Sequence, residues 1–156
     1  MIHPTLARLA KNREHLLEIV GDLPDRALDL RLEESWSIRQ ILTHLVNAEE
    51  DHRQIIEVIV NGDLDRLPAQ VQLHEHNAAR LAERGHLTHD ELLAALNAQR
   101  EQTIALFNSL SADQLAEVGP HPVMGEMSVV NIFRVIAMHE HTHARDIQAI
   151  LTNAGL

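Results

Sequence analysis

The chain has 156 residues, which corresponds to about one domain and is long enough to bury a core. A total of 13 Lys and Arg against 23 Asp and Glu gives a formal net charge of -10, which excludes nucleic-acid phosphates and anionic membrane surfaces as expected partners. Because there is no cysteine, disulfides, thiolate metal ligands and a cysteine nucleophile are excluded, and a bound metal must use nitrogen and oxygen ligands.

The first two predicted helices lie in the N-terminal part of the chain. Apolar residues at helical spacing predict a helix over residues 3–21, with Gly21 at its end. Ser37 and Gln40 form a capping box, in which each side chain satisfies a free backbone donor of the other residue. They predict the start of a second helix, which runs over about residues 38–60.

The middle of the chain has a weaker pattern followed by a stronger one. We predict a helix over residues 69–84, although the polar run 74–77 interrupts its apolar face. Thr88 and Glu91 form a second capping box. They open a predicted helix whose apolar face continues to Leu110.

The C-terminal part begins with a third capping box, at Ser111, which predicts a short helix. A loop is predicted over residues 119–125, and a last helix runs from Ser128 until Gly155 ends it. With 6 Gly and 5 Pro the chain has few of the turn-forming residues that separate the strands of a many-stranded sheet. Four long amphipathic helices therefore predict an all-α, four-helix bundle that forms a single domain over residues 1–156.

The last helix carries a pair of histidines in an apolar stripe. At 100° per residue, His139 and His143 fall in the same stripe as four isoleucines, namely Ile132, Ile136, Ile147 and Ile150. Residues at i and i+4 have Cβ atoms about 5–6 Å apart, so both imidazoles can reach one metal ion. The alternative is a pair of core-edge histidines that bind backbone carbonyls. We favour the metal, because burying two unpaired imidazoles is costly.

Residues 139–143 also match H-E-x-x-H, the signature of zinc proteases in which the glutamate is the general base. Those enzymes take a third ligand from further along the chain, but only 13 residues follow His143. A protease is therefore not expected. Glu140 lies about 60° from the centre of the histidine pair, so it either borders the site or is a solvated or capping charge.

The third ligand must come from another helix, because catalytic sites use three protein ligands and an open position. His44 and His52 are the candidates in the second predicted helix. They are two turns apart and are not expected to bind the same ion. Helical periodicity alone favours His52, which lies closer to the centre of the apolar stripe.

Three motifs resemble the DinB-like superfamily of metal-binding four-helix bundles, which includes bacillithiol and mycothiol transferases. Residues 36–45 resemble its second-helix motif, residues 121–125 resemble a loop before its last helix, and residues 139–143 resemble its paired-histidine motif. The resemblance implies a metal site made by His44, His139 and His143. His52 then becomes a core residue or a neighbour of the ligands.

One position departs from this family pattern. Many relatives carry a glutamine three residues after the second histidine of the pair, whereas this chain has Asp146. Asp146 could orient a ligand imidazole, bind the ion directly, or pair with Arg145 or Arg39. Its role is left open by the sequence.

Three functions are compatible with the sequence. The least favoured is a helical interaction protein without metal, which would require the paired histidines to be hydrogen-bonded in the core. The first is an enzyme that uses a divalent ion, Zn²⁺ or Ni²⁺, to lower the pKa of a bound thiol or water. The resemblance implies transfer of a low-molecular-weight thiol or hydrolysis of a small molecule, with Glu140 or Asp146 as proton carriers. The second is a non-catalytic, metal-stabilised helical module that binds a ligand or a protein partner. A fourth position filled by Asp146 or Glu140 would favour the module, and one filled by water would favour the enzyme.

The remaining expectations concern partners and location. We expect a small-molecule substrate, and apolar helix faces left over from the bundle could support a homodimer. Residues 1–5 lack the start of a signal peptide, and no segment approaches about 18 uninterrupted apolar residues, so we expect a cytoplasmic protein. The sequence assigns no role to His74 or His76.

Overall fold

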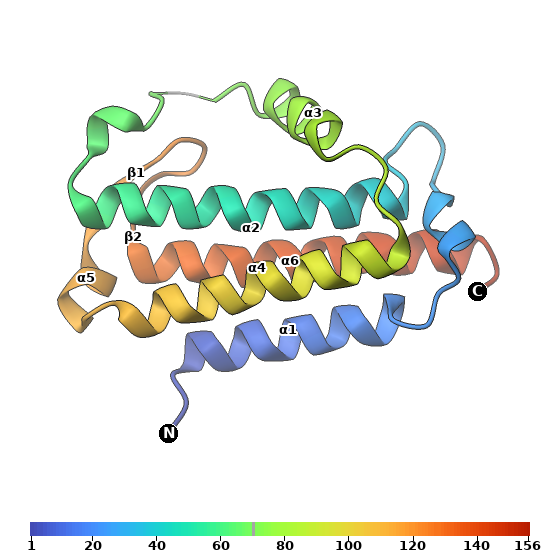
Figure 1. Ribbon diagram of the computed structural model, residues 1–156, viewed down its shortest axis with the longest axis horizontal. Coiled ribbons are helices and arrows are strands. Elements are labelled where there is room, and N and C mark those ends of the chain that lie inside the picture. Colours follow the sequence, from blue (N-terminus) through green and yellow to red (C-terminus); the bar gives the residue numbers. More distant parts are fainter. Residues whose placement is uncertain (70) are drawn as a thin grey trace.

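The computed structural model describes residues 1–69 and 71–156, and four long helices form its body (Figure 1). These are α1 (Pro4–Val20), α2 (Ile38–Asn61), α4 (His89–Ser109) and α6 (Val129–Asn153). Helices α1 and α6 run in one direction along the bundle, and α2 and α4 run in the other (Figure 1). The predicted all-α, four-helix bundle is confirmed.

Because α2 and α4 are parallel, the chain between them must return along the outside of the bundle. This connection, residues 62–88, carries the short helix η2 (Leu64–Arg66) and then α3 (Leu73–Arg84), which lies over α2 (Figure 1). The helix expected over residues 69–84 begins at Leu73, and Gln70 lies outside the described residues. The connection covers a side of α2 that its neighbours in the bundle leave open.

The three predicted capping boxes are present. Oγ of Ser37 accepts a hydrogen bond from the amide of Gln40, and the Gln40 side chain accepts one from the amide of Ser37. The same reciprocal bonds open α4 at Thr88 and the short helix α5 (Ala112–Ala116) at Ser111. These local bonds explain why the starts of the helices are readable from the sequence. Between α1 and α2 lies a 3₁₀ helix, η1 (Asp25–Asp29).

A β-hairpin replaces the loop expected over residues 119–125. Strands β1 (Val118–His121) and β2 (Gly125–Ser128) pair antiparallel, with His121 opposite Gly125. The expectation of a loop was wrong because each strand has four residues, and β1 contains Gly119 and Pro120, which are unfavourable in strands. Gly119 has a packing role, since a Cβ there would lie 2.6 Å from Cγ1 of Ile59. The hairpin therefore lies directly on α2.

A polar layer divides the apolar core into two clusters. One cluster includes Leu16, Leu42 and Leu96, and the other includes Leu9, Ile56 and Phe133. Between them each long helix contributes a buried charged residue, and these residues are Arg13, Glu49, Arg100 and Glu140. The four helices are thus joined by ion pairs at mid-height and by apolar packing on either side.

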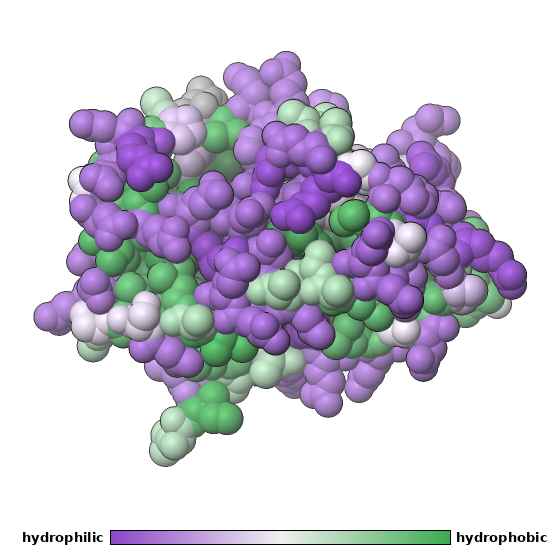
Figure 2. All heavy atoms as spheres, viewed as in Figure 1, coloured by the Kyte–Doolittle hydropathy of each residue, from purple (hydrophilic) through white to green (hydrophobic). Residues whose placement is uncertain are grey.

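The outer surface in the view of Figure 2 is mostly hydrophilic, with smaller hydrophobic patches between the polar side chains. The N-terminal Met1 and Ile2 protrude and are exposed. Within the two described ranges, no helix combines the length and the apolar character that a membrane span requires.

Candidate metal centre

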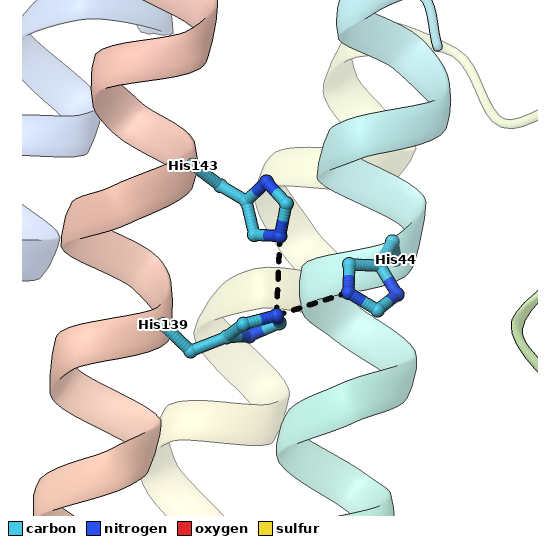
Figure 3. Close-up of side chains that lie close together, drawn as sticks. All are labelled: His44, His139 and His143. Carbon is cyan, nitrogen blue, oxygen red and sulfur yellow. Dashed lines mark hydrogen bonds between the residues drawn. The ribbon is translucent and has the colours of Figure 1, made fainter. Parts of the chain in front are cut away.

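Three histidine nitrogens from two helices converge on one point (Figure 3). His139 and His143 project from successive turns of α6 toward α2, and His44 projects from α2 toward them. Nε2 of His139 lies 3.0 Å from Nε2 of His44 and 3.1 Å from Nε2 of His143. The structure therefore brings together the three residues that the family resemblance implied as ligands.

The spacing of these nitrogens fits a metal ion better than it fits hydrogen bonds. Three nitrogens bound tetrahedrally to one Zn²⁺ at about 2.0–2.1 Å lie roughly 3.3 Å apart, close to the distances from His139 to His44 and His143. Each nitrogen of a neutral imidazole offers either one hydrogen or one lone pair. Nε2 of His139 therefore cannot make two good hydrogen bonds, whereas a cation can accept a lone pair from each ring.

Burial keeps these imidazoles unprotonated. Loss of solvent, reinforced by the neighbouring His143, lowers the pKa of His44 to about 4. Burial, with the same neighbour, lowers the pKa of His139 to about 2. Burial also lowers the pKa of His143, although the Asp146 carboxylate opposes that shift. At neutral pH all three rings are thus in the neutral form that a metal requires.

The metal-free protein is expected to lose stability on mild acidification. Folding lowers the pKa values of His44 and His121, each to about 4, so below pH 6.5 the unfolded chain binds protons that the folded chain does not. These two groups cost no stability above pH 6.5, and they lower the free energy of unfolding as the pH drops toward 4, by at most about 1.4 kcal/mol per group and pH unit. Urea unfolding of metal-free protein at pH 7.5, 6.0 and 5.0 measures this slope. Unfolding free energies that stay constant from pH 6.5 to 5.0 would contradict it.

Asp146 contacts the outer edge of one candidate ligand. Its Oδ2 lies 3.1 Å from Nδ1 of His143, although the two groups are not aligned as a hydrogen bond. A carboxylate behind a ligand imidazole orients the ring and increases its basicity. The alternative pairing with Arg39 is wrong, because Arg39 binds Asp25 and Asp29 instead.

The structure brings His44, and not the His52 that helical periodicity favoured, to the paired histidines of α6. The N-terminal half of α2 is buried on all sides by η1, α3, α4 and α6, so its apolar stripe does not identify the face that meets α6. His44 lies in this half and is 8% exposed. His52 does not belong to the group of three converging nitrogens, and its ring centre is 6.5 Å from that of His139.

Glu140 belongs to the polar layer. Its Oε1 accepts a hydrogen bond from Nε of Arg13 at 2.6 Å, and its Oε2 accepts one from Nη2 of Arg100 at 2.9 Å. Because Glu140 is 2% exposed, the alternative of a solvated or capping charge is wrong. Both oxygens are occupied by arginines, so this placement does not support the predicted role of Glu140 as a proton carrier. The buried face of α6 is centred near Glu140, and the paired histidines lie at its edge.

A cavity of about 490 Å³ opens beside the three histidines. His44 and His139 line it, together with His52 of α2 and His121 of the hairpin. Its walls also include apolar side chains from α2, from the connection between α2 and α4, and from the hairpin, among them Val58, Leu67 and Val123. Surface hollows of about 580 and 560 Å³ lie elsewhere and are not lined by the three histidines.

The sequence pattern of the DinB superfamily matches residues 8–147. The chain belongs to this superfamily. The family resemblance inferred from three motifs is therefore confirmed, and it covers nearly the whole bundle. Membership agrees with the convergence of one histidine from α2 and two from α6, which had been expected from the resemblance.

The chain is also similar to one curated relative and to solved four-helix bundles. A protein of Oceanobacillus iheyensis, named as a candidate metal-dependent hydrolase, is 25% identical over 97% of this chain and 86% of its own length. YfiT of Bacillus subtilis, described as a probable metal-dependent hydrolase with an unusual four-helix bundle topology, superposes with a TM-score of 0.78 at 19% identity, covering 99% and 91% of the two chains. The four-helix bundle protein TT2238 gives a TM-score of 0.66 at 22% identity, covering 92% and 94%.

Proposed function

We propose that this DinB-superfamily chain is a divalent-metal-dependent hydrolase of a small molecule, with His44, His139 and His143 as the metal ligands. The observation that carries the proposal is the convergence of the three Nε2 atoms, two of which belong to histidines that line a cavity of about 490 Å³. The name of the relative from Oceanobacillus iheyensis supports the same reaction class.

The role of each residue follows from its position relative to the three histidine nitrogens. A divalent ion, Zn²⁺ or Ni²⁺, held by these nitrogens would lower the pKa of a water or thiol and so supply a nucleophile at neutral pH. Asp146, whose Oδ2 lies 3.1 Å from Nδ1 of His143, would favour this orientation of the ring by its charge. Trp36 packs against the ring of His44, with 4.9 Å between ring centres, and restricts its rotation. The apolar walls of the cavity reduce the water around the reacting groups.

The environment of the two acidic candidates favours an enzyme over a metal-stabilised module. A structural site fills four positions, whereas a catalytic site leaves one open. Glu140 is held by two arginines, and Asp146 contacts the ring nitrogen of His143 that faces away from the convergence point. In residues 1–69 and 71–156 no carboxylate joins the three converging nitrogens. A metal held by the three histidines would therefore keep a position for water or substrate, and two of these histidines line the cavity.

The proposal is tested by comparing metal-stripped protein with protein reloaded with Zn²⁺ or Ni²⁺. Small esters and amides are the substrates, each assayed with and without an added low-molecular-weight thiol. We expect hydrolysis at least about 100-fold faster after reloading, because metal polarisation contributes several kcal/mol to such reactions. His44→Ala protein, treated identically, should stay at the metal-free rate. A product that carries the thiol would assign the site to thiol transfer, and equal rates with and without metal would contradict the proposal.

A further inference from the structure

His121, which lines the cavity beside the metal centre, carries a fixed hydrogen-bond donor. Its Nδ1 accepts hydrogen bonds from the backbone amides of Val123 and Met124, each at 3.1 Å. Nδ1 therefore carries no proton, and the proton of the neutral ring is on Nε2. Burial lowers the pKa of His121 to about 4, so the ring is neutral at pH 7. Within the described part of the chain, Nε2 is buried and has no hydrogen-bond partner.

His52 presents the complementary group. Its Nδ1 lies 2.7 Å from the carbonyl oxygen of Ala48, one turn earlier in α2. A carbonyl oxygen only accepts, so Nδ1 of His52 carries the proton and Nε2 offers a lone pair. Burial lowers the pKa of His52 and keeps this ring neutral as well. Because Nδ1 faces back along its own helix, Nε2 points away from the helix.

The two rings lie side by side in the wall of the cavity. Their centres are 5.1 Å apart and their planes are inclined by 37°. His121 is 6% exposed and is held from the hairpin, while His52 is held from α2. One rigid donor and one rigid acceptor, supplied by two different elements, are thus carried by neighbouring residues that line the same cavity. A buried donor without a partner is costly unless a ligand satisfies it.

We propose that His52 and His121 form a recognition site for a neutral H–N–C=O group of the substrate, as found in an amide, lactam or ureide. His121 donates from Nε2 to the carbonyl oxygen, and His52 accepts the N–H at Nε2. This assignment rests on the proposed function, because it names the class of substrate that would be held beside the metal centre. The apolar side chains of the cavity bind the body of the molecule.

The pair discriminates against related groups. A carboxylate has two acceptors, so it would satisfy His121 but would face the lone pair of His52. A ketone or ester retains the acceptor and lacks the N–H. Sites that hydrogen-bond a substrate N–H reject analogues lacking it, because a polar group of the protein is then left unpaired. The site therefore selects for the amide-like group rather than for any carbonyl compound.

The tautomers are the first test, and they are independent of activity. In zinc-loaded protein, ¹⁵N NMR of the imidazoles should show the proton of His52 on Nδ1 and that of His121 on Nε2. The opposite tautomer on either ring would overturn the proposal. His76, which lines the same cavity and pairs with Asp51, gives a separate resonance for comparison.

The second test measures ligand binding with benzamide and acetophenone as probes. The two molecules have the same shape and both have a carbonyl group, but benzamide carries NH₂ where acetophenone carries CH₃. His52→Asn and His121→Asn are matched variants. Asparagine keeps a hydrogen-bonding group at the position of Nδ1 and has none at the position of Nε2. We expect His121→Asn to weaken both probes about fivefold to tenfold, and His52→Asn to weaken benzamide alone by a similar factor. His141→Asn, at an exposed position of α6 that does not line this cavity, should leave both affinities unchanged.

The outcomes separate this proposal from the proposed function. Equal effects of His52→Asn on the two probes, or unchanged affinities in both variants, would overturn the recognition site even if the reloaded protein hydrolyses its substrates. The expected pattern of affinities would support the recognition site even if no metal-dependent hydrolysis is found. Dissociation constants from NMR titration of the same samples supply both comparisons.

Discussion

His139→Ala protein is expected to lose the bound metal ion that wild-type protein holds at about one per chain. His139 is the central residue of the site, because its Nε2 lies within 3.1 Å of the Nε2 atoms of both His44 and His143. Structural zinc sites bind with about 10–16 kcal/mol in total, so each ligand contributes roughly 3 kcal/mol. Its removal should weaken binding by more than about 100-fold. Elemental analysis of untagged protein, with chelator competition for the affinity, measures the loss.

Matched variants decide which histidines are the ligands. His44→Ala and His143→Ala should lose the metal as His139→Ala does. His52→Ala and His141→Ala should retain it, because His52 lies beyond the three converging nitrogens and His141 is exposed on the other side of α6. If His44→Ala retained the metal and His52→Ala lost it, the third ligand would be His52 and not His44.

The parts of the fold that depend on neighbouring residues were predictable. Each capping box joins residues three apart, so the starts of α2, α4 and α5 could be predicted from four-residue patterns. The pair His139 and His143 was predictable for the same reason, since an i, i+4 spacing brings two side chains together on any helix. These features need no knowledge of how the helices pack.

The features that depend on packing were not predictable from periodicity. The choice between His44 and His52 depends on which side of α2 meets α6, and α2 is buried on all sides near His44. The family resemblance indicated the histidine that lies beside His139 and His143, whereas the pattern of apolar residues did not. The hairpin depends on the contact of Gly119 with Ile59, which lie far apart in the sequence. The sequence indicated His121 only as part of a motif. The backbone amides that bind its Nδ1 come close to the ring only in the folded turn.

The polar layer could have been predicted from charged residues at apolar positions of the helices. Arg13 falls at an apolar position of the first helix, and Glu140 falls near the centre of the buried face of the last. A charged residue at an apolar position in each of four helices predicts that the charges meet, because unpaired charges are rarely buried. Arg13 and Glu140 do meet, in an ion pair of 2.6 Å.

Glu140→Ala is expected to lower the free energy of unfolding by about 3–5 kcal/mol, the usual cost of removing one partner from a buried ion pair. Glu140 and Glu49 share Arg13 and Arg100, and all four side chains are at most 8% exposed. Burial alone would raise the pKa of Glu49, but the charge of Arg100 lowers it overall, so Glu49 stays ionised. Without Glu140, two buried guanidinium groups face this one remaining carboxylate.

Urea unfolding at pH 7.5 measures the loss, with Glu14→Ala as the control. Glu14 is adjacent to Arg13 in the sequence but exposed, so its removal should change the unfolding free energy by less than about 0.5 kcal/mol. The double variant Arg100→Leu with Glu140→Leu should cost less than the two single changes added together, because it removes a pair rather than one charge.

The variant Glu140→Gln separates the two roles considered for Glu140. If Glu140 carried protons at the metal centre, Glu140→Gln, which keeps the shape of the side chain, would reduce turnover and leave stability nearly intact. If Glu140 instead joins α6 to α1 and α4 through Arg13 and Arg100, the variant unfolds at lower urea while its folded fraction keeps its metal. We expect the second result, because both carboxylate oxygens bind arginines and neither is free to exchange a proton with a substrate.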